Sequence, residues 1–375
     1  MSFEDLPADW ATRPLTDEAI LADVIDLVVT NRDRIAGAAY ILLCGPTDRL
    51  LQPCAVTDLG RKRVADRRAV IEPFARIGDG VLRTQLRLGG FRSRFVETRA
   101  GQMHALVASG HGDLPPFVLL HGFAAASHYY GGVASRMLPL VRQVLAPDLP
   151  GHGKSAGDAS VIDWSTLEDG LLDTLDHLID RPAIVFGNSL GGAAAVRYAA
   201  RRPQNVRGLF LVAPGGAPMD DATFRSFLAR FALDDHDDAL DFVDRLFATP
   251  PPYRHLLAWG TRQQFRRPTM RALMERGLAI DLLTPSELRT LSMPTHVVWG
   301  GADRVLLPSH LSFFREHLPS HATLDVVPRF GHTPHMDHPE ALHTMLVGFA
   351  REAAPKRSTP GTVPAGSRST PPPGA

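Results

Sequence analysis

The stretch that decides the fold is AIVFGNSLGG, residues 183–192. A short apolar run, which predicts a buried strand, leads directly into the pattern Gly-x-Ser-x-Gly. An alanine-rich helical pattern follows from Ala193 to Ala200. This order of strand, tight turn and helix is typical of a nucleophile elbow, in which a strained turn holds one serine hydroxyl above a sheet. Ser189 is therefore the candidate nucleophile.

The same pattern also fits a glycine-rich turn with an ordinary serine, because Gly-x-Ser-x-Gly arises by accident in long, glycine-rich chains. Two observations favour the elbow. Gly187 and Gly191 stand where a strained turn packs against neighbouring backbone, a place that suits residues without a side chain. The strand pattern before the turn and the helical pattern after it are the flanks that an elbow needs.

A serine becomes a strong nucleophile beside a histidine base, and the base needs an acid to orient it. After an elbow, the acid follows the serine in the chain and the histidine comes last. Residues 295–300 predict a buried strand, and Asp303 stands in the loop after it, where α/β sheets place ligand-handling residues. Asp303 is the candidate acid; the alternative is a capping residue for a helix that starts near Pro308.

The candidate base is His332. Residues 322–328 alternate like a last strand, and Gly331 and His332 stand in the loop between this strand and the final predicted helix. A lone histidine among the 16 in the chain carries little information, so the assignment depends on this loop setting.

The histidines at 332, 335 and 338 are close enough in sequence to suggest a metal site. Pro334 and Pro339 interrupt any helix that would align them, and no His-Glu-x-x-His pattern is present. We therefore expect no metal and no cofactor, and we interpret His335 and His338 as surface or helix-start residues.

A tetrahedral intermediate needs two backbone N–H donors for its oxyanion. One is expected to be the N–H of Leu190, directly after the nucleophile. The other is expected from the loop after the strand at 116–120, where His121 and Gly122 precede Phe123. Phe123 is the candidate donor, and His121 is interpreted as a residue that holds the loop.

Five segments occur in one order along the chain: LLHGF at 119–123, APDLPGHGKS at 146–155, GNSLGG at 187–192, WGGAD at 299–303 and GHTPH at 331–335. As a set they resemble the α/β-hydrolase superfamily, over about residues 92–352. The resemblance implies an α/β fold with a mostly parallel eight-stranded sheet and helices on both faces. It also implies a triad of Ser189, His332 and Asp303, with Phe123 and Leu190 as oxyanion donors. The 146–155 segment is usually structural in this superfamily, so His152 is not a catalytic candidate.

The resemblance narrows the chemistry to a cofactor-free serine hydrolase acting on an ester-like bond of a small, largely apolar carbonyl compound. A serine in the elbow argues against haloalkane dehalogenases and epoxide hydrolases, which carry aspartate there. The elbow is also similar to that of hydrolases that cleave carbon–carbon bonds in meta-cleavage products, but those typically have tryptophan where this chain has Thr333. A carbon–carbon hydrolase, a thioesterase, an acyltransferase and a perhydrolase remain alternatives, as does a non-catalytic ligand receptor or scaffold.

The composition and the cysteine content indicate the broad class of protein. The 375-residue chain has a formal net charge of zero, so no electrostatic argument favours a nucleic-acid partner. The first residues lack the basic start and apolar centre of a signal peptide, and no apolar run reaches the ~18–20 residues that span a bilayer. Two cysteines, Cys44 and Cys54, predict reduced thiols. We expect a cytoplasmic enzyme with a small-molecule substrate.

The chain divides into three predicted parts. Residues 1–91 are expected to form an N-terminal helical extension that packs on the core or makes a homo-oligomer or partner contact. Residues 92–352 form the hydrolase domain, and residues 353–375, rich in proline, serine and glycine, predict a disordered tail. Strands are predicted at 94–97, 103–109, 116–120, 142–147, 183–188, 207–213, 295–299 and 322–327.

Aromatic residues at helical spacing between about 216 and 290 interrupt the alternation of strands and helices. We expect a helical cap there, inserted over the active site and lining an apolar pocket. Four arginines in this interval are interpreted as a solvated basic face rather than a site for a substrate anion: Arg262, Arg266, Arg267 and Arg271.

Overall fold

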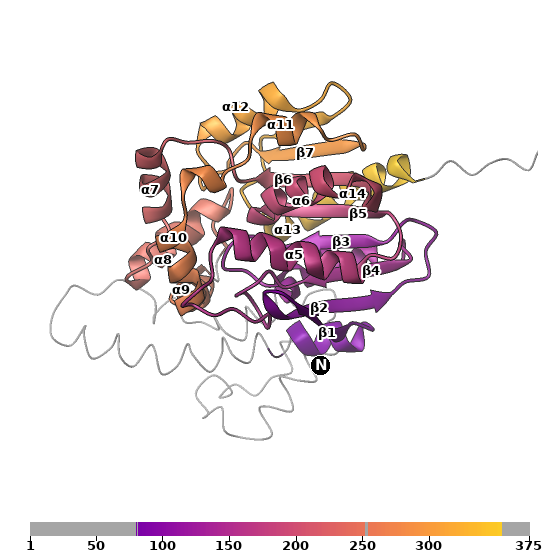
Figure 1. The fold of residues 1–375 in the computed structure, drawn as a ribbon, viewed down its shortest axis with the longest axis horizontal. Helices are drawn as coiled ribbons and strands as arrows, with labels where there is room; N and C mark the ends of the chain where they lie inside the picture. Colours follow the sequence, from indigo (N-terminus) through magenta and orange to yellow (C-terminus); the bar gives the residue numbers. More distant parts are fainter. Residues whose placement is uncertain (1–79, 81, 252–253, 355–375) are drawn as a thin grey trace, which may run out of the picture.

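The structure, a computed structural model, describes residues 80, 82–251 and 254–354. Within this part of the chain, eight strands form one sheet in the order β1-β2-β4-β3-β5-β6-β7-β8 (Figure 1). β2 is antiparallel to both its neighbours, β1 and β4, and all other neighbouring strands are parallel. The strands are β1 (Arg92–Thr98), β2 (Gly101–Ser109), β3 (Phe117–Leu120), β4 (Gln143–Pro147), β5 (Ala183–Ser189), β6 (Val206–Pro214), β7 (Thr295–Gly300) and β8 (Thr323–Val327).

The eight predicted strands are confirmed, with bounds that differ by at most two residues. Every residue of β3 is buried, as is every residue of β5 except Ser189 at its end. Strands of a parallel sheet are covered on both faces, which is why these segments read as continuous apolar runs rather than as alternating ones.

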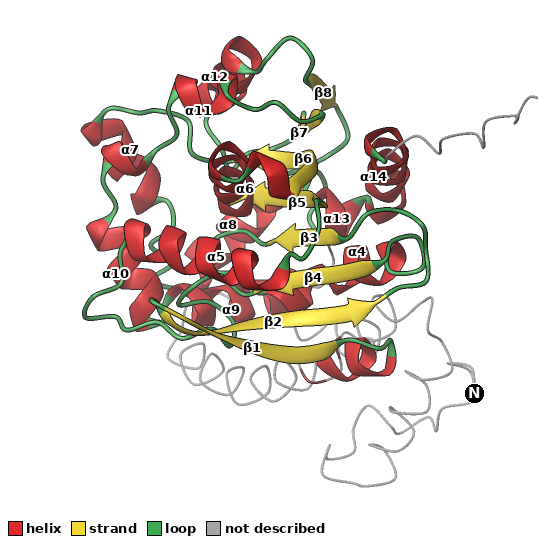
Figure 2. Cartoon of the chain, turned by 45° about the vertical axis from the view of Figure 1, so that its right-hand side comes forward, coloured by secondary structure: helices red, strands yellow, loops and turns green. Residues whose placement is uncertain are grey.

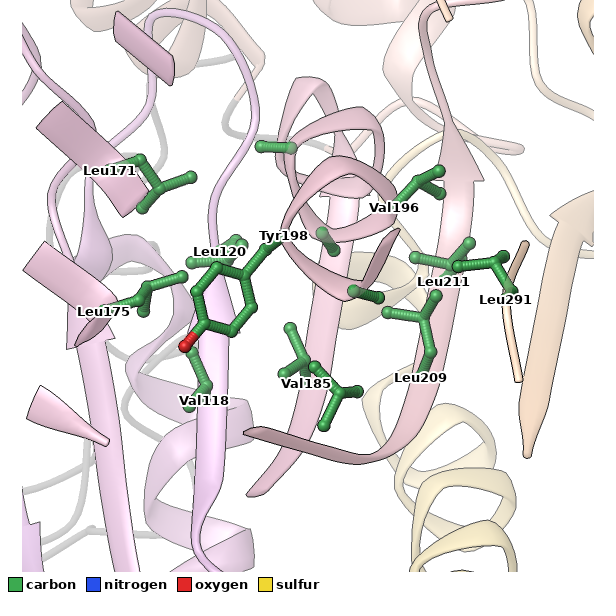
Figure 3. Packing of buried hydrophobic residues seen from close by; sticks show 14 of the residues in the cluster. Val118, Leu120, Leu171, Leu175, Val185, Val196, Tyr198, Leu209, Leu211 and Leu291 are labelled. Carbon is green, nitrogen blue, oxygen red and sulfur yellow. The ribbon is translucent and has the colours of Figure 1, made fainter. Parts of the chain in front are cut away.

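Helices cover both faces of the sheet, and α5 and α6 lie side by side on one of them (Figure 2). Successive strand residues point to opposite faces. Val185 belongs to the hydrophobic cluster that holds Leu175 of α5 and Tyr198 of α6 (Figure 3), whereas Phe186 belongs to the cluster that holds Phe349 of α14. The helices are α4 (Gly131–Met137), α5 (Trp164–Leu178), α6 (Leu190–Arg201), α7 (Asp221–Ala229), α8 (His236–Leu246), α9 (Arg254–Phe265), α10 (Pro268–Arg276), α11 (Pro285–Arg289), α12 (Pro308–His317), α13 (Pro334–Asp337) and α14 (Pro339–Ala353).

The interval between β6 and β7 contains α7 to α11, and most of these helices project beyond the sheet on the left of Figure 1. Many of their apolar side chains form a third hydrophobic cluster, separate from the two that cover the sheet. Phe242 of α8, Phe265 of α9 and Leu273 of α10 are members of this cluster. The cluster also includes Ala124, Ile162, Leu167 and Val305, so it joins the inserted helices to the rest of the domain.

Most of the predicted N-terminal extension, including both cysteines, lies outside the described residues. At its end, residues 82–88 form a helix, and Leu86 of this helix packs against Gly131 of α4. At the other end of the chain, the tail was predicted to begin at Ala353, but Ala353 is the buried last residue of α14. Residues 355–375 lie outside the described part of the chain. None of the helices that the structure describes is long and apolar enough to cross a membrane.

Candidate active site

Ser189 stands at a sharp turn between β5 and α6. Its backbone has φ 55° and ψ −120°, a conformation that costs a residue other than glycine about 1–3 kcal/mol. The turn is tight: a Cβ added at Gly187 would lie 2.3 Å from the Gly191 carbonyl oxygen, and one at Gly191 would lie 2.2 Å from the Leu120 carbonyl oxygen. Only glycine fits at both positions, so the predicted strand–turn–helix geometry is present.

Asp303 and His332 meet from two different loops. His332 Nδ1 lies 2.8 Å from Asp303 Oδ2, and both side chains are almost completely buried. Asp303 Oδ1 accepts the N–H groups of Val305 at 2.8 Å and Leu306 at 3.2 Å. The capping alternative is wrong, because the residue before α12 is Leu307 and no side chain caps that helix.

The charge on Asp303 fixes the tautomer of its partner. Burial opposes ionisation of Asp303, but the attraction and hydrogen bond of His332, with the loop N–H groups, hold the pKa of this carboxyl below its usual value. A carboxylate can only accept, so Nδ1 of His332 carries the proton and donates it to the hydrogen bond. Nε2 is left as the basic nitrogen.

The sequence did not indicate that Asn188 connects the elbow to the histidine loop. Its Nδ2 donates to the Val212 carbonyl at 2.9 Å and to the His332 carbonyl at 3.1 Å. Its Oδ1 accepts the Tyr130 hydroxyl at 2.7 Å, and that hydroxyl accepts the N–H of Gly122 at 3.3 Å. One buried network therefore connects the residue next to Ser189 to the backbone of the candidate base and to the candidate oxyanion loop.

The loop after β3, which carries the candidate donor Phe123, is held in place by His121. His121 Nε2 accepts the N–H of Leu149 at 3.0 Å, so Nδ1 carries the proton and donates to the Gly122 carbonyl at 2.8 Å. Because the peptide is planar and trans, fixing this carbonyl turns the N–H of Phe123 to the opposite side. Burial lowers the pKa of His121, which agrees with a neutral imidazole.

The two candidate donors flank Ser189. A Cβ added at Gly122 would lie 3.4 Å from Ser189 Cβ, which brings the Phe123 loop against the nucleophile. Leu190 is the first residue of α6, and the first four N–H groups of a helix have no acceptor within the helix. Among the described residues, no hydrogen bond uses the N–H of Phe123 or Leu190.

The loop after β4 is structural, in agreement with its interpretation from sequence. Asp148 accepts the N–H groups of Ser127 at 2.7 Å and Lys154 at 2.9 Å, and it lies 2.8 Å from His104 Nδ1. Burial opposes its ionisation, but these hydrogen bonds hold the pKa of Asp148 well below its usual range. His152 Nδ1 donates to the Pro150 carbonyl at 2.9 Å, and burial lowers the pKa of His152 to about 3.

The histidines after position 332 do not converge on one point. His335 is in α13, as expected of a helix-start residue, but it is buried rather than on the surface, and its ring stacks on Tyr130 at 4.1 Å. His338 stacks instead on Phe330, with ring centroids 5.3 Å apart. Over residues 80, 82–251 and 254–354, no group of three or more His, Cys, Asp or Glu residues is placed to hold a metal ion.

A cavity of about 660 Å³ brings the candidate residues together. Ser189, Leu190, Phe123 and His332 all line it. The helices between β6 and β7 supply an apolar wall made of Phe224, Phe227, Leu228, Phe231, Phe242, Leu256, Leu257 and Phe265. A mostly apolar cavity with a few polar groups at one place is the usual form of a small-molecule site.

The four arginines singled out in the sequence do not line this cavity. Arg266 and Arg271 are exposed, Arg262 donates to the Leu233 carbonyl at 3.3 Å, and Arg267 lies 3.5 Å from the Gly153 carbonyl. Their positions therefore give no support to the alternative of a substrate-anion site, and the exposed Arg266 and Arg271 agree with the predicted solvated face.

The end of α8 is hydrogen-bonded to both loops that carry the candidate acid and the candidate base. The Leu246 carbonyl accepts the N–H of His332 at 2.8 Å, and it accepts the N–H and the hydroxyl of Thr333, each at 3.2 Å. Arg304, next to the candidate acid, donates to the Phe247 carbonyl at 3.1 Å. These contacts cross long sequence separations, and no pattern in the sequence predicted them.

Several known proteins similar to this chain in sequence or fold are named as esterases, lipases or hydrolases, and one is named as an acetyltransferase component. Residues 117–344 match the model of the alpha/beta hydrolase family. A pimeloyl-[acyl-carrier protein] methyl ester esterase of Nitrosomonas europaea is 30% identical over 252 residues, which cover 61% of this chain and 93% of that protein. The exception is a dihydrolipoyllysine-residue acetyltransferase component of the acetoin cleaving system of Pseudomonas putida, 32% identical over 250 residues, with 63% of this chain and 64% of that protein covered. The crystal structure of a membrane phospholipase A superposes with a TM-score of 0.64 at 25% identity, covering 79% of this chain and 97% of that one.

Proposed function

Since this chain belongs to the alpha/beta hydrolase family and is a carboxylic-ester-hydrolase-like enzyme, we propose that it cleaves an ester of a small, largely apolar compound through an acyl-enzyme on Ser189. The observation that carries the proposal is the buried pair of His332 and Asp303, 2.8 Å apart, because His332 lines the same cavity as Ser189. A base oriented in this way is what a serine needs to become nucleophilic.

Acylation follows from the tautomer of His332. Nε2 takes the proton of the Ser189 hydroxyl as Oγ attacks the ester carbonyl carbon, and the carbonyl oxygen becomes an oxyanion. The N–H groups of Phe123 and Leu190 bind that oxygen, each worth about 3 kcal/mol of transition-state stabilisation in comparable enzymes. When the C–O bond breaks, His332 returns its proton to the departing alcohol.

Deacylation repeats the sequence with water. His332 accepts a proton as the water oxygen attacks the acyl carbon, and the proton passes back to Ser189 when the acid leaves. Asp303 keeps its negative charge throughout and stabilises the imidazolium in both halves of the cycle.

The cavity wall supports an apolar substrate. Phenylalanine and leucine side chains from α7, α8 and α9 face the space beside Ser189, and burying an apolar group there gains about 25 cal/mol per Å². Hydrolases of meta-cleavage products typically have a tryptophan directly after the catalytic histidine, where this chain has Thr333. We therefore place ester hydrolysis ahead of carbon–carbon cleavage.

The test is the Ser189→Ala variant, assayed with p-nitrophenyl esters of short and medium acyl chains. We expect turnover to fall by at least about a thousandfold with an unchanged melting temperature, because the substitution removes the nucleophile alone. Acyl-thioesters and a ring-fission dienoate in the same panel separate the thioesterase and carbon–carbon alternatives. Undiminished ester hydrolysis by Ser189→Ala contradicts the proposal.

A further inference from the structure

The cavity beside Ser189 has two ends, one over each face of the sheet. Val185 and Phe186 are neighbours on β5, so their side chains point to opposite faces. Met137 of α4 packs in the hydrophobic cluster of Phe186, whereas Leu175 of α5 packs in that of Val185. Residues of α4, α5 and α6 all line the cavity, and α6 shares the face of α5. The cavity therefore crosses the carboxyl edge of the sheet, where β5 ends.

Paired charges line the end of the cavity that lies beside α6. Arg197 Nη1 lies 3.1 Å from Glu168, and Nη2 donates to the carbonyls of Asp281 at 2.7 Å and Leu282 at 3.1 Å. All four residues line the cavity, and the side chains of Arg197 and Glu168 are mostly buried. An apolar chain placed here would take the remaining water from these charges, which is unfavourable. This end is therefore poorly suited to a continuing alkyl chain.

The other end of the cavity, beside α4, reaches the surface in the part of the chain that the structure describes. Tyr129, Gly132 and Arg136 line it, and spacings of three and four residues place them along one side of the helical segment. Tyr129 is 38% exposed, and Leu82, which also lines the cavity, is 39% exposed. Gly132 is exposed as well. A chain that starts at Ser189 can therefore pass α4 and reach solvent.

Gly132 leaves this end of the cavity wide. A Cβ added at Gly132 would meet no atom within 4 Å, whereas one at the preceding Gly131 would lie 3.1 Å from the Leu86 side chain. The backbone of Gly132 is helical, so a larger residue there brings neither strain nor a clash with the protein. Because Gly132 lines the cavity, a side chain at this position would take up space at the open end.

The charge of Arg136 stays in water at the rim. Its guanidinium lies 2.6 Å from a carboxylate oxygen of Glu340, and both side chains are exposed. The carbon stem of an arginine packs against apolar groups while its charged head remains hydrated. An alkyl chain can therefore pass along this side chain without burying its charge.

We propose that Gly132 is a specificity-determining residue. The side chain that it lacks leaves open the passage along which a long alkyl chain of the ester extends from Ser189 to the surface. The inference rests on the proposed function, because it names the substrate class of that site as esters with a long alkyl chain. The chain belongs either to the acyl group or to the alcohol, and the two arms of the test distinguish these sources.

The test compares kcat/KM of the wild type and of Gly132→Phe for esters that differ only in chain length, each dissolved as a monomer and followed by acid release. The acyl arm pairs ethyl decanoate with ethyl butanoate, and the alcohol arm pairs decyl acetate with butyl acetate. We expect Gly132→Phe to lower the value for the longer ester about tenfold or more in one arm, because the phenyl ring takes the space of the chain. The value for the shorter ester should stay within about threefold of wild type.

Gly348→Phe is the matched control. Gly348 is an exposed glycine of α14, a Cβ added there also meets no atom within 4 Å, and it does not line the cavity. The ratio of kcat/KM between long and short ester should equal that of the wild type. Gly132→Leu should shift the ratio in the same direction as Gly132→Phe, but less. It replaces Gly132→Phe in the comparison if the phenylalanine lowers the melting temperature more than Gly348→Phe does.

The outcomes separate the role of Gly132 from the reaction itself. A ratio that is the same in the wild type and in both Gly132 variants overturns the role of Gly132 and leaves the proposed function intact. So does an equal loss on the long and the short ester, an equal shift in Gly348→Phe, or a wild type that hydrolyses only the short esters. Failure of the wild type to hydrolyse any of the esters overturns both.

Discussion

At the scale of single residues, the site contains buried polar side chains that each make several hydrogen bonds. Asp303 accepts from His332 and from two loop N–H groups, and Asn188 uses both its amide and its carbonyl. Buried polar groups satisfied in this way hold one geometry, because any alternative leaves a donor or an acceptor unpaired. Ser189 is held differently, by a strained backbone that two glycines allow.

We predict that Asp303→Asn lowers kcat by about a thousand- to ten-thousandfold with little change in KM. The asparagine amide turned towards His332 favours the tautomer with the proton on Nε2, and that tautomer cannot accept the Ser189 proton. Steady-state kinetics on a p-nitrophenyl ester give both constants.

Asp325→Asn is the matched control, because this aspartate lies on β8 and pairs with His296 at 3.0 Å, outside the cavity lining. Its kcat should stay at the wild-type value. Near-normal kcat in Asp303→Asn contradicts the assignment of the acid.

At the scale of elements, the helices inserted between β6 and β7 are hydrogen-bonded to the loops that carry Asp303 and His332. The end of α8 supplies the Leu246 carbonyl to the backbone of His332, and the Phe247 carbonyl accepts from Arg304. The loops after β7 and β8 are thus attached to one short segment of the insertion. A shift of that segment is expected to move the candidate base.

We predict that Arg304→Met lowers kcat/KM about tenfold, because a hydrogen bond between a charged group and a carbonyl is worth about 1.5 kcal/mol. The effect should appear in kcat as well as in KM, since the segment also contacts His332. Steady-state kinetics again provide the measurement.

The control is Arg315→Met, an exposed arginine in the last turn of α12. It should leave both constants unchanged. Equal effects of the two substitutions would mean that the loss of positive charge, rather than the contact with α8, is responsible.

At the scale of the whole molecule, several histidines are buried in a neutral state. Burial lowers the pKa of His152 and of His335 to about 3, and that of His310 to about 4, from the ordinary value of 6.5. The unfolded chain therefore binds protons below pH 6.5 that the folded chain does not bind. Each such histidine lowers the free energy of unfolding as the pH falls from about 6.5 towards its folded pKa.

We predict that the protein is markedly less stable at pH 5 than at pH 7, with each of these histidines contributing up to about 1.4 kcal/mol per pH unit. Urea unfolding followed by circular dichroism at both pH values measures the difference. His310→Leu should show a smaller difference than wild type, because one of the titrating groups is gone. A wild-type stability that is equal at the two pH values contradicts this account.

The strands of the sheet and the order of the candidate catalytic residues along the chain could be predicted from the sequence, since both depend on local signals. Buried strands read as apolar runs, and the turn at Ser189 needs glycines at fixed positions. The network of Tyr130 and Asn188 was not predictable, because Asn188 meets the His332 carbonyl across 144 residues. The same holds for the contacts of the Leu246 carbonyl, which depend on how the inserted helices pack.

The most direct measurement of the central claim is covalent labelling with a fluorophosphonate, followed by peptide mass spectrometry. A serine activated by a buried histidine–aspartate pair should react as one adduct per chain on the peptide that contains Ser189. Labelling should be absent in Ser189→Ala and at least about a hundredfold slower in His332→Ala. An adduct on another residue, or a folded wild-type protein that does not react, would contradict the account.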